Sequence, residues 1–165
     1  MAADVVLKME PAESCADLWS AYFGALGPKR MRDCFGWDEP PKEPRWGESV
    51  WVFKAHGRRV AWSSVTRYPK EPSIFELALG VWPRHQGRGY RGQILDMTAT
   101  AAFEDLKAEE VVMLVLDSCH RHQVQCLRDA QEHRTPWVHS GVVWYPDPYM
   151  TFTLTRDAWV ASRRK

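Results

Sequence analysis

The sequence predicts one α/β (mixed α+β) domain, with a central mixed β-sheet of about six to seven strands and helices on both of its faces. Strand and helix signals alternate along most of the 165 residues, of which 45% are hydrophobic and 26% are charged, as in ordinary globular domains. Paired strands come first and a strand–helix–strand unit follows. A chain of this length forms one core, so residues 1–165 are predicted to be a single domain.

The first half of the chain is predicted to be mainly antiparallel. Hydrophobic periodicity predicts a strand at 5–9, a helix at 12–26, an irregular connection at 28–49 with one helical turn near 29–34, and strands at 49–55 and 59–68. The first helix is expected to stop at Gly27-Pro28, because both residues are helix breakers. His56-Gly57 joins the two later strands and is typical of a tight hairpin turn.

The second half is predicted to contain a parallel strand pair. The signals indicate a strand at 73–81, a helix at 90–107, a strand at 110–116, a short helix at 122–133, and strands at 137–144 and 149–155. The run at 110–116 is continuously apolar, which is typical of a strand buried on both faces. The unit 73–116 should therefore be a right-handed crossover between parallel neighbours.

Charge and cysteine usage limit the class of protein. The net charge of +1 excludes a chain that binds polyanions through its overall charge, so any attraction to phosphate must be local. The four cysteines form no C-x-x-C pair, which favours reduced thiols in a cytoplasmic protein. No apolar run approaches the roughly 20 residues that span a bilayer, and no signal peptide is recognisable, so neither a membrane nor a secretory route is expected.

A basic, glycine-containing loop connects the strand at 73–81 to the helix at 90–107. Gly87 and Gly89 lack a Cβ atom, so their backbone amides can approach an anion closely. The helix N-terminus adds positive partial charge, and Arg84 and Arg88 add charge-assisted contacts. Such a site suits a pyrophosphate, so the loop predicts a nucleotide-like cofactor; the alternative is a basic turn with no ligand.

The same loop carries a family resemblance. Arg84-His-Gln-Gly87-Arg-Gly89 resembles the Gln/Arg-x-x-Gly-x-Gly/Ala motif of the GCN5-related N-acetyltransferase (GNAT) superfamily, which also lies between a strand and a helix. Two flanking matches extend it: Val81-x-Pro83 before the motif and Ile94-Leu95 after it. The predicted order of elements resembles the fold of this family over nearly the whole chain.

The resemblance implies an enzyme, an N-acetyltransferase that uses acyl-CoA, most often acetyl-CoA, and no metal. The acyl group would pass to a primary amine by direct attack on the thioester. The strands at 73–81 and 110–116 would splay apart to admit the pantetheine arm. The residues expected at the cofactor are Leu79, Val81, Arg84, His85, Gln86, Gly87, Arg88, Gly89, Tyr90 and Arg91.

The sequence also departs from the family pattern. Arg91 stands where the family commonly has a small residue, and its side chain is expected either to reach a CoA phosphate or to alter the loop. Many members carry an asparagine after the fifth strand and a tyrosine on the next helix, which protonates the leaving thiolate. This chain contains no asparagine, and no tyrosine occurs between Tyr90 and Tyr145, so the usual acid cannot be carried over.

Glu76 is the first candidate for the base that deprotonates the amine. It alternates with small neighbours along its strand, which leaves room beside it for substrate or water. The structural alternative is a buried carboxylate paired with Arg59 or Arg67.

His120 and His122 are candidates for the acid or the base, because the pKa of histidine lies near neutrality. Both follow the C-terminal end of the strand at 110–116, where sites of α/β proteins gather. The alternatives are a solvated or capping role, and an acyl-cysteine route through Cys119. Two histidines without a third ligand do not predict a metal site.

The amine acceptor is expected between the segment after the first helix and the last loop. These segments carry aromatic residues among carboxylates, which suits a cationic and partly flat amine. The candidate substrate-binding residues are Trp37, Trp46, Tyr145 and Tyr149. The alternative is a hydrophobic lid with no substrate role.

Two further functions stay open at this point. The aromatic and Arg/His-rich segments would allow an amine-bearing nucleic-acid base as the acceptor, although the small net charge disfavours tight duplex binding. The missing acid would also fit a non-catalytic CoA-binding module. The expected partner is a small-molecule or macromolecular amine, and the expected assembly is a monomer or a homodimer.

Overall fold

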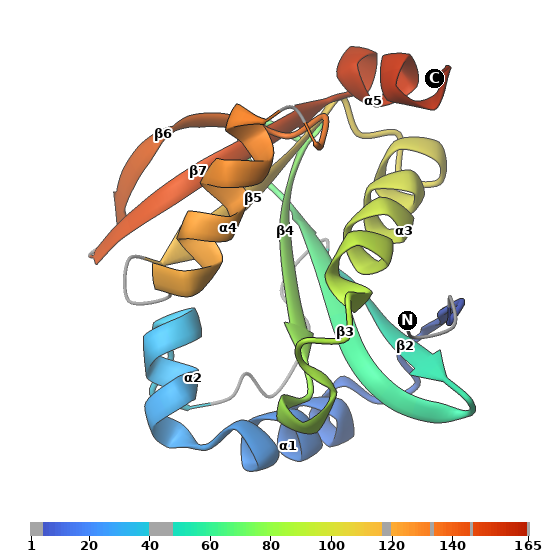
Figure 1. Cartoon of the computed structure of the whole chain (residues 1–165), viewed down its shortest axis with the longest axis vertical. Helices are drawn as coiled ribbons and strands as arrows, with labels where there is room; N and C mark the ends of the chain where they lie inside the picture. Colours follow the sequence, from blue (N-terminus) through green and yellow to red (C-terminus); the bar gives the residue numbers. More distant parts are fainter. Residues whose placement is uncertain (1–4, 40–47, 117–119, 133, 146, 165) are drawn as a thin grey trace.

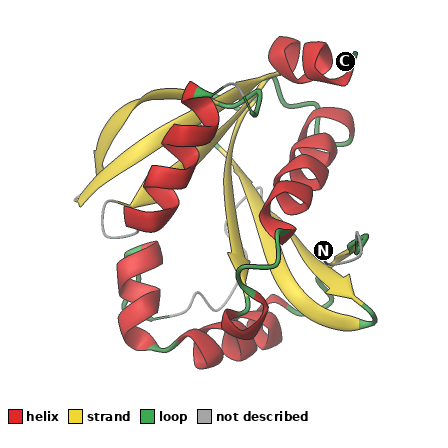
Figure 2. Cartoon of the chain, viewed as in Figure 1, coloured by secondary structure: helices red, strands yellow, loops and turns green. Residues whose placement is uncertain are grey.

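The computed structural model describes residues 5–39, 48–116, 120–132, 134–145 and 147–164. Seven strands, five α-helices and one short 3₁₀ turn are assigned in it (Figures 1 and 2). In chain order they are β1 Lys8–Pro11, α1 Cys15–Leu26, α2 Pro28–Phe35, β2 Glu48–Ala55, β3 Arg58–Arg67, β4 Ile74–Val81, the 3₁₀ turn Pro83–His85, α3 Tyr90–Glu104, β5 Glu110–Leu116, α4 His120–Gln131, β6 Val138–Tyr145, β7 Asp147–Thr155 and α5 Arg156–Arg163.

The strands form one mixed sheet in the order β1-β2-β3-β4-β5-β7-β6. Every neighbouring pair is antiparallel except β4 and β5, which run parallel and are connected through α3. This arrangement confirms the predicted mixed sheet and its strand–helix–strand unit. It also brings the start of α3 to the end of β4, where the glycine-containing loop lies.

Helices pack on both faces of the sheet. The face of β4 that carries Phe75 and Leu77 packs against α3, in a core that includes Leu95 and Phe103. Ala78 belongs to the opposite face, where α1 packs in an aromatic core around Trp62. Because side chains alternate along a strand, β4 contributes to both cores.

The hairpin between β2 and β3 has the turn that its sequence predicts. His56 and Gly57 both have positive φ angles, 50° and 75°, as a two-residue turn of the I′ type requires. The hairpin thereby holds Arg58 and Arg59 at the first two positions of β3, next to the end of β4.

The segment after α1 differs from the prediction. A full helix, α2, starts at Pro28 and ends at Gly36, where the sequence predicted an irregular connection with a single helical turn. Proline is favoured at the first helical position because its missing N–H would have no helical partner there. Gly36 adopts the left-handed conformation that closes a helix (φ 69°), and Met31 buries the helix against the aromatic core.

The last helix, α5, was not predicted. The hydroxyl of Thr155 caps it by accepting a hydrogen bond from the backbone N–H of Ala158 (3.2 Å). Trp159 anchors it, with its ring stacked on Phe103 at 5.1 Å between centroids. Eight residues give too short a window for helical periodicity to be recognised without these contacts.

Among the described helices, none has the length and apolar character needed to cross a membrane.

A close contact at Gly80 generates a stability prediction. A Cβ atom there would lie 2.4 Å from Nε1 of Trp62 and 2.5 Å from the hydroxyl oxygen of Tyr22, whereas one at Gly92 would have nothing within 4 Å. We expect Gly80→Ala to lower the free energy of unfolding by about 1–3 kcal/mol through overpacking. Gly92→Ala should leave it unchanged or raise it by up to about 1 kcal/mol. Urea denaturation measures both, and equal midpoints would contradict the packing described at Gly80.

Candidate functional site

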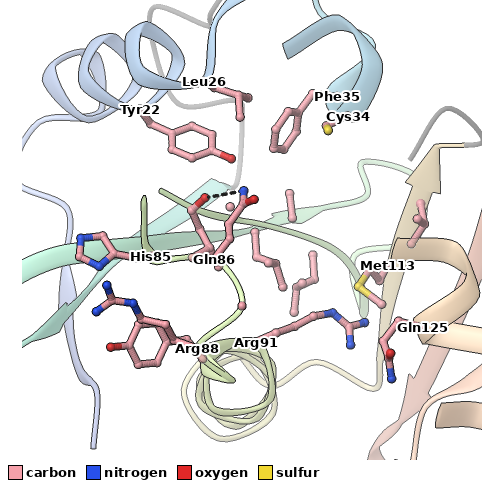
Figure 3. A pocket seen from close by; sticks show the side chains of 18 of the residues that line it. Tyr22, Leu26, Cys34, Phe35, His85, Gln86, Arg88, Arg91, Met113 and Gln125 are labelled. Carbon is pink, nitrogen blue, oxygen red and sulfur yellow. Dashed lines mark hydrogen bonds between the residues drawn. The ribbon is translucent and has the colours of Figure 1, made fainter. Parts of the chain in front are cut away.

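A cavity of about 890 Å³ opens where β4 and β5 separate. The loop before α3 and the first residues of α3 form one end of it, and α1 and α2 form the other (Figure 3). Its walls include Ala78, Leu79, Gly80 and Val81 of β4. The cavity therefore connects the glycine-containing loop to the aromatic core under α1.

The separation of the two strands has a definite start. Parallel pairing of β4 with β5 ends at Leu77 and Met113, although β4 continues to Val81 and β5 to Leu116. Figure 1 shows β4 running on toward α1 while β5 turns toward α4. Beyond Leu77, β4 remains paired with β3 on its other edge. The edge that faces β5 thus offers backbone N–H and C=O groups to the cavity.

The loop has the backbone geometry of an anion cradle. Gly87 and Gly89 have φ angles of 75° and 79°, and a Cβ atom at either would have nothing within 4 Å. Gly89 is the N-cap of α3 and offers no side chain to the first helical N–H groups. Open space in front of uncapped amides at a helix N-terminus is the arrangement that binds phosphate.

The three arginines of this region point in different directions. Arg88 lines the main cavity. Arg84 instead lines a smaller cavity of about 430 Å³ on the side of the β2–β3 hairpin. Arg91 extends the opposite way from Arg88, toward α4 (Figure 3). Of the two arginines expected at the pyrophosphate, the structure brings Arg88 to the cavity wall and turns Arg84 away from it.

Arg91 contacts α4 rather than the loop. Its Nη2 lies 2.7 Å from Sγ of Cys126, and its Nη1 lies 3.5 Å from a carboxylate oxygen of Asp129. Burial raises the pKa of Cys126 to about 11, so the thiol stays protonated beside the guanidinium. Arg91 therefore links the start of α3 to α4, although part of its side chain still lines the cavity.

His85 lies among positive charges. Its ring lines the cavity, and neither ring nitrogen has a hydrogen-bond partner in the part of the chain that the structure describes. Burial lowers the pKa of His85, and the guanidinium groups of Arg88, Arg84 and Arg58 lower it further. The imidazole is thus neutral at neutral pH and has unused capacity to bind a polar group.

Tyr22 is a site residue that the sequence did not predict, because its spacing on α1 marked it as core. The side chain is only 2% exposed, yet it lines the cavity, and its hydroxyl points toward the loop (Figure 3). The missing side chain of Gly80 provides the space that this hydroxyl occupies. The hydroxyl of a buried tyrosine normally needs a polar group close to it. A tyrosine on the apolar face of α1 could therefore have indicated that a polar space lies beside this helix.

Glu76 is not among the described residues that line the cavity. It lies on the same face of β4 as Ala78, two residues and about 7 Å further from the loop. One of its carboxylate oxygens accepts a hydrogen bond from the hydroxyl of Tyr68 (3.3 Å). The guanidinium groups of Arg59 and Arg67, the alternative partners, lie over the rings of other residues.

The histidine candidates follow β5. The backbone brings His120 and His122 to the first turn of α4. Their side chains, like that of Tyr145 at the end of β6, lie outside the described residues, and so does Trp46.

The remaining acceptor candidates are not among the described lining residues. Trp37 packs on Phe23 and Phe35, with ring centroids at 5.4 Å and 5.3 Å, so it belongs to the aromatic core under α1. Tyr149 lies on β7 opposite Leu116. The α1–α2 end of the cavity is instead lined by Leu26, Phe35 and Cys34 together with Tyr22.

Across the described residues, no three His, Cys, Asp or Glu side chains gather as a metal site requires.

Solved structures of acetyltransferases share this fold. A chimera of the spermidine N-acetyltransferase SpeG from Vibrio cholerae and hSSAT is 12% identical, with a TM-score of 0.71 over 94% of this chain and 98% of its own. The aminoglycoside acetyltransferase AAC(6′)-Ib in complex with coenzyme A is 13% identical, with a TM-score of 0.72 over 96% and 99%. The spermidine/spermine N-acetyltransferase SpeG from Vibrio cholerae is 10% identical, with a TM-score of 0.70 over 94% and 96%.

No protein-family model and no curated protein matches the sequence. The solved structures show that the chain has the fold of these acetyltransferases, which is the fold that the resemblance of the loop motif implies.

The charges around His85 generate a prediction. Among the charges that lower this pKa, Arg88 has the largest effect, so Arg88→Gln should raise the pKa of His85 toward the ordinary value, although burial will keep it below that value. Titration of the His85 ring protons by NMR measures the shift. An unchanged titration would show that the charge of Arg88 does not contribute to the lowered pKa of His85.

Proposed function

We propose that this chain is an acyl-CoA-dependent N-acyltransferase that transfers an acetyl group from acetyl-CoA to a primary amine. The separation of β4 from β5 beyond Leu77 and Met113 is the observation that carries the proposal. It creates a passage from an anion cradle to an end lined by aromatic side chains of α1 and α2, which suits a cofactor with a pyrophosphate, a long arm and a reactive tip.

The residues present fit acyl-CoA. The uncapped amides after Gly87 and Gly89, together with Arg88, would hold the pyrophosphate. The open edge of β4, including the backbone of Leu79 and Val81, would hydrogen-bond the amide groups of the pantetheine arm as a neighbouring strand does. The side-chain amide of Gln86 donates to the carbonyl of Val81 (3.2 Å), and the second lone pair of this oxygen would remain for a donor on the arm.

The structural relatives support the same assignment. One of them is an aminoglycoside acetyltransferase in complex with coenzyme A, and others are spermidine acetyltransferases. Both kinds of enzyme act on small amines, so we infer a small-molecule amine as the acceptor of this chain.

The reaction needs two proton transfers. The amine nitrogen bonds to the thioester carbonyl carbon as the C–S bond breaks; the nitrogen loses a proton, and the leaving thiolate gains one. We assign the second transfer to the hydroxyl of Tyr22, which lies beside Gly80 on the cavity wall. Glu76 is our candidate base and would act through water, because it lies beyond the described lining of the cavity.

The cradle is tested by two glycines with the same backbone geometry. Gly57 in the β2–β3 turn and Gly87 in the loop both have φ 75° and open space at the Cβ position. Valine at either should cost about 1–3 kcal/mol of stability through strain. Only Gly87→Val should abolish the thermal stabilisation by acetyl-CoA, because its side chain fills the cradle. Retained stabilisation in Gly87→Val would overturn the assignment of the cradle.

The catalytic assignment is tested by measuring CoA thiol release with a panel of primary amines. Tyr22→Phe keeps the buried ring and removes the hydroxyl, so we expect kcat to fall by about a hundredfold at unchanged affinity for acetyl-CoA. Glu76→Gln should slow transfer by at least about tenfold. A normal rate would remove the substituted residue from the mechanism. Binding of acetyl-CoA by the unmodified protein without thiol release for any amine would favour a non-catalytic CoA-binding module.

A further inference from the structure

Four arginines surround the hairpin side of the loop. Arg58 and Arg59 begin β3, Arg84 belongs to the 3₁₀ turn, and Arg88 lies in the loop. Three of them, Arg58, Arg59 and Arg84, line the smaller cavity of about 430 Å³, together with the ring of Trp82. Neither these three arginines nor Trp82 lines the main cavity that would hold the pyrophosphate and the pantetheine arm.

In the part of the chain that the structure describes, no carboxylate neutralises the positive charge of this cluster. Among the described residues, none of the four guanidinium groups has a carboxylate within 4 Å. Elsewhere the arginines with a carboxylate within that distance are Arg32, Arg91, Arg134, Arg156 and Arg163. The whole chain has 22 basic and 21 acidic residues, so an unpaired basic cluster does not follow from composition. Like charges this close repel one another, and a bound anion would relieve the repulsion.

One arginine of this cluster, Arg59, is supported by the aromatic core. The guanidinium carbon of Arg59 lies 5.9 Å from the ring centroid of Trp82, within reach of a cation–π contact. Trp82 is 7% exposed and belongs to the aromatic core under α1, so it is a fixed support. Arg58 follows the tight His56-Gly57 turn, which fixes its backbone. A donor that is already positioned, as Arg59 is, loses less entropy when it binds a ligand.

The two cavities are close enough for one ligand to reach both. Arg84 precedes Gly87 by three residues, which span at most about 11 Å of chain. His85 lines the main cavity but is also influenced by Arg58 and Arg84 of the cluster. A nucleotide that carries a pyrophosphate and a separate phosphate is long enough to cover the distance between Arg84 and Gly87.

We propose that the cavity formed by Arg58, Arg59, Arg84 and Trp82 binds a phosphomonoester dianion. The 3′-phosphate of CoA supplies this dianion, an assignment that rests on the proposed function. The other source of the same chemistry is a free phosphate or a small phosphorylated molecule. Guanidinium forks suit a phosphomonoester because they donate paired hydrogen bonds to its oxygens.

The first experiment compares CoA with dephospho-CoA by isothermal titration calorimetry. We expect the unmodified protein to bind CoA about tenfold more tightly than dephospho-CoA. The double variant Arg58→Gln/Arg84→Gln should lose about this tenfold for CoA and nothing for dephospho-CoA. The control Lys70→Gln/Arg164→Gln removes the same net charge at two exposed positions and should bind both ligands normally. Equal affinities for the two ligands, or an equal loss for both in the double variant, would overturn CoA as the source.

The second experiment separates this proposal from the proposed function. Inorganic phosphate is added to the unmodified protein, and the titration of His85 is followed by NMR. A phosphate bound beside Arg58 and Arg84 should raise the pKa of His85, because it offsets two of the charges that lower it, and the double variant should lose this response. If phosphate raises the pKa of His85 but the protein does not bind CoA, the site is confirmed as one for free phosphate and the proposed acyltransferase function is rejected. No response, together with no preference for CoA over dephospho-CoA, would overturn the site itself.

Discussion

The candidate site depends on where the pairing of β4 with β5 stops. The backbone ladder joins Ile74–Leu77 to Glu110–Met113 and no further, while β3 continues to hold the other edge of β4. Strand edges inside a protein are normally paired or covered, because a buried backbone N–H or C=O group without a hydrogen bond is costly. Here the open edge borders a cavity, which makes it a place for a ligand that can hydrogen-bond like a strand.

Most of the fold could be predicted from the sequence because its signals are local. Strict alternation, the His56-Gly57 turn and the continuous apolar run of β5 each indicate one element without help from the rest of the chain. The exceptions were α2 and α5. Both have eight residues, and both depend on tertiary anchors, the burial of Met31 and the stacking of Trp159 on Phe103.

The site was less predictable than the fold. The loop motif brought Gly87, Gly89 and Arg88 to attention because their chemistry depends on adjacent residues. The direction of Arg84, by contrast, is decided by a 3₁₀ turn and by a hairpin about 25 residues earlier, neither of which its own neighbourhood reveals. The cavity position of Tyr22 arises because Gly80, on a different element, leaves room for its hydroxyl. A contact between two residues that lie on different elements leaves no periodic pattern in the sequence, so a single sequence cannot reveal it.

The contact of Arg91 with α4 has a consequence for cooperativity. The start of α3 follows β4, whereas α4 follows β5, so this contact crosses the line along which the sheet divides. Four paired residues on each strand are a short ladder for joining two halves of a sheet. Arg91 adds a side-chain contact between the two halves of the sheet where β4 and β5 are no longer paired. This contact favours unfolding of the two halves together and disfavours local opening between β4 and β5. Arg91 thus couples the order of the loop to the order of α4.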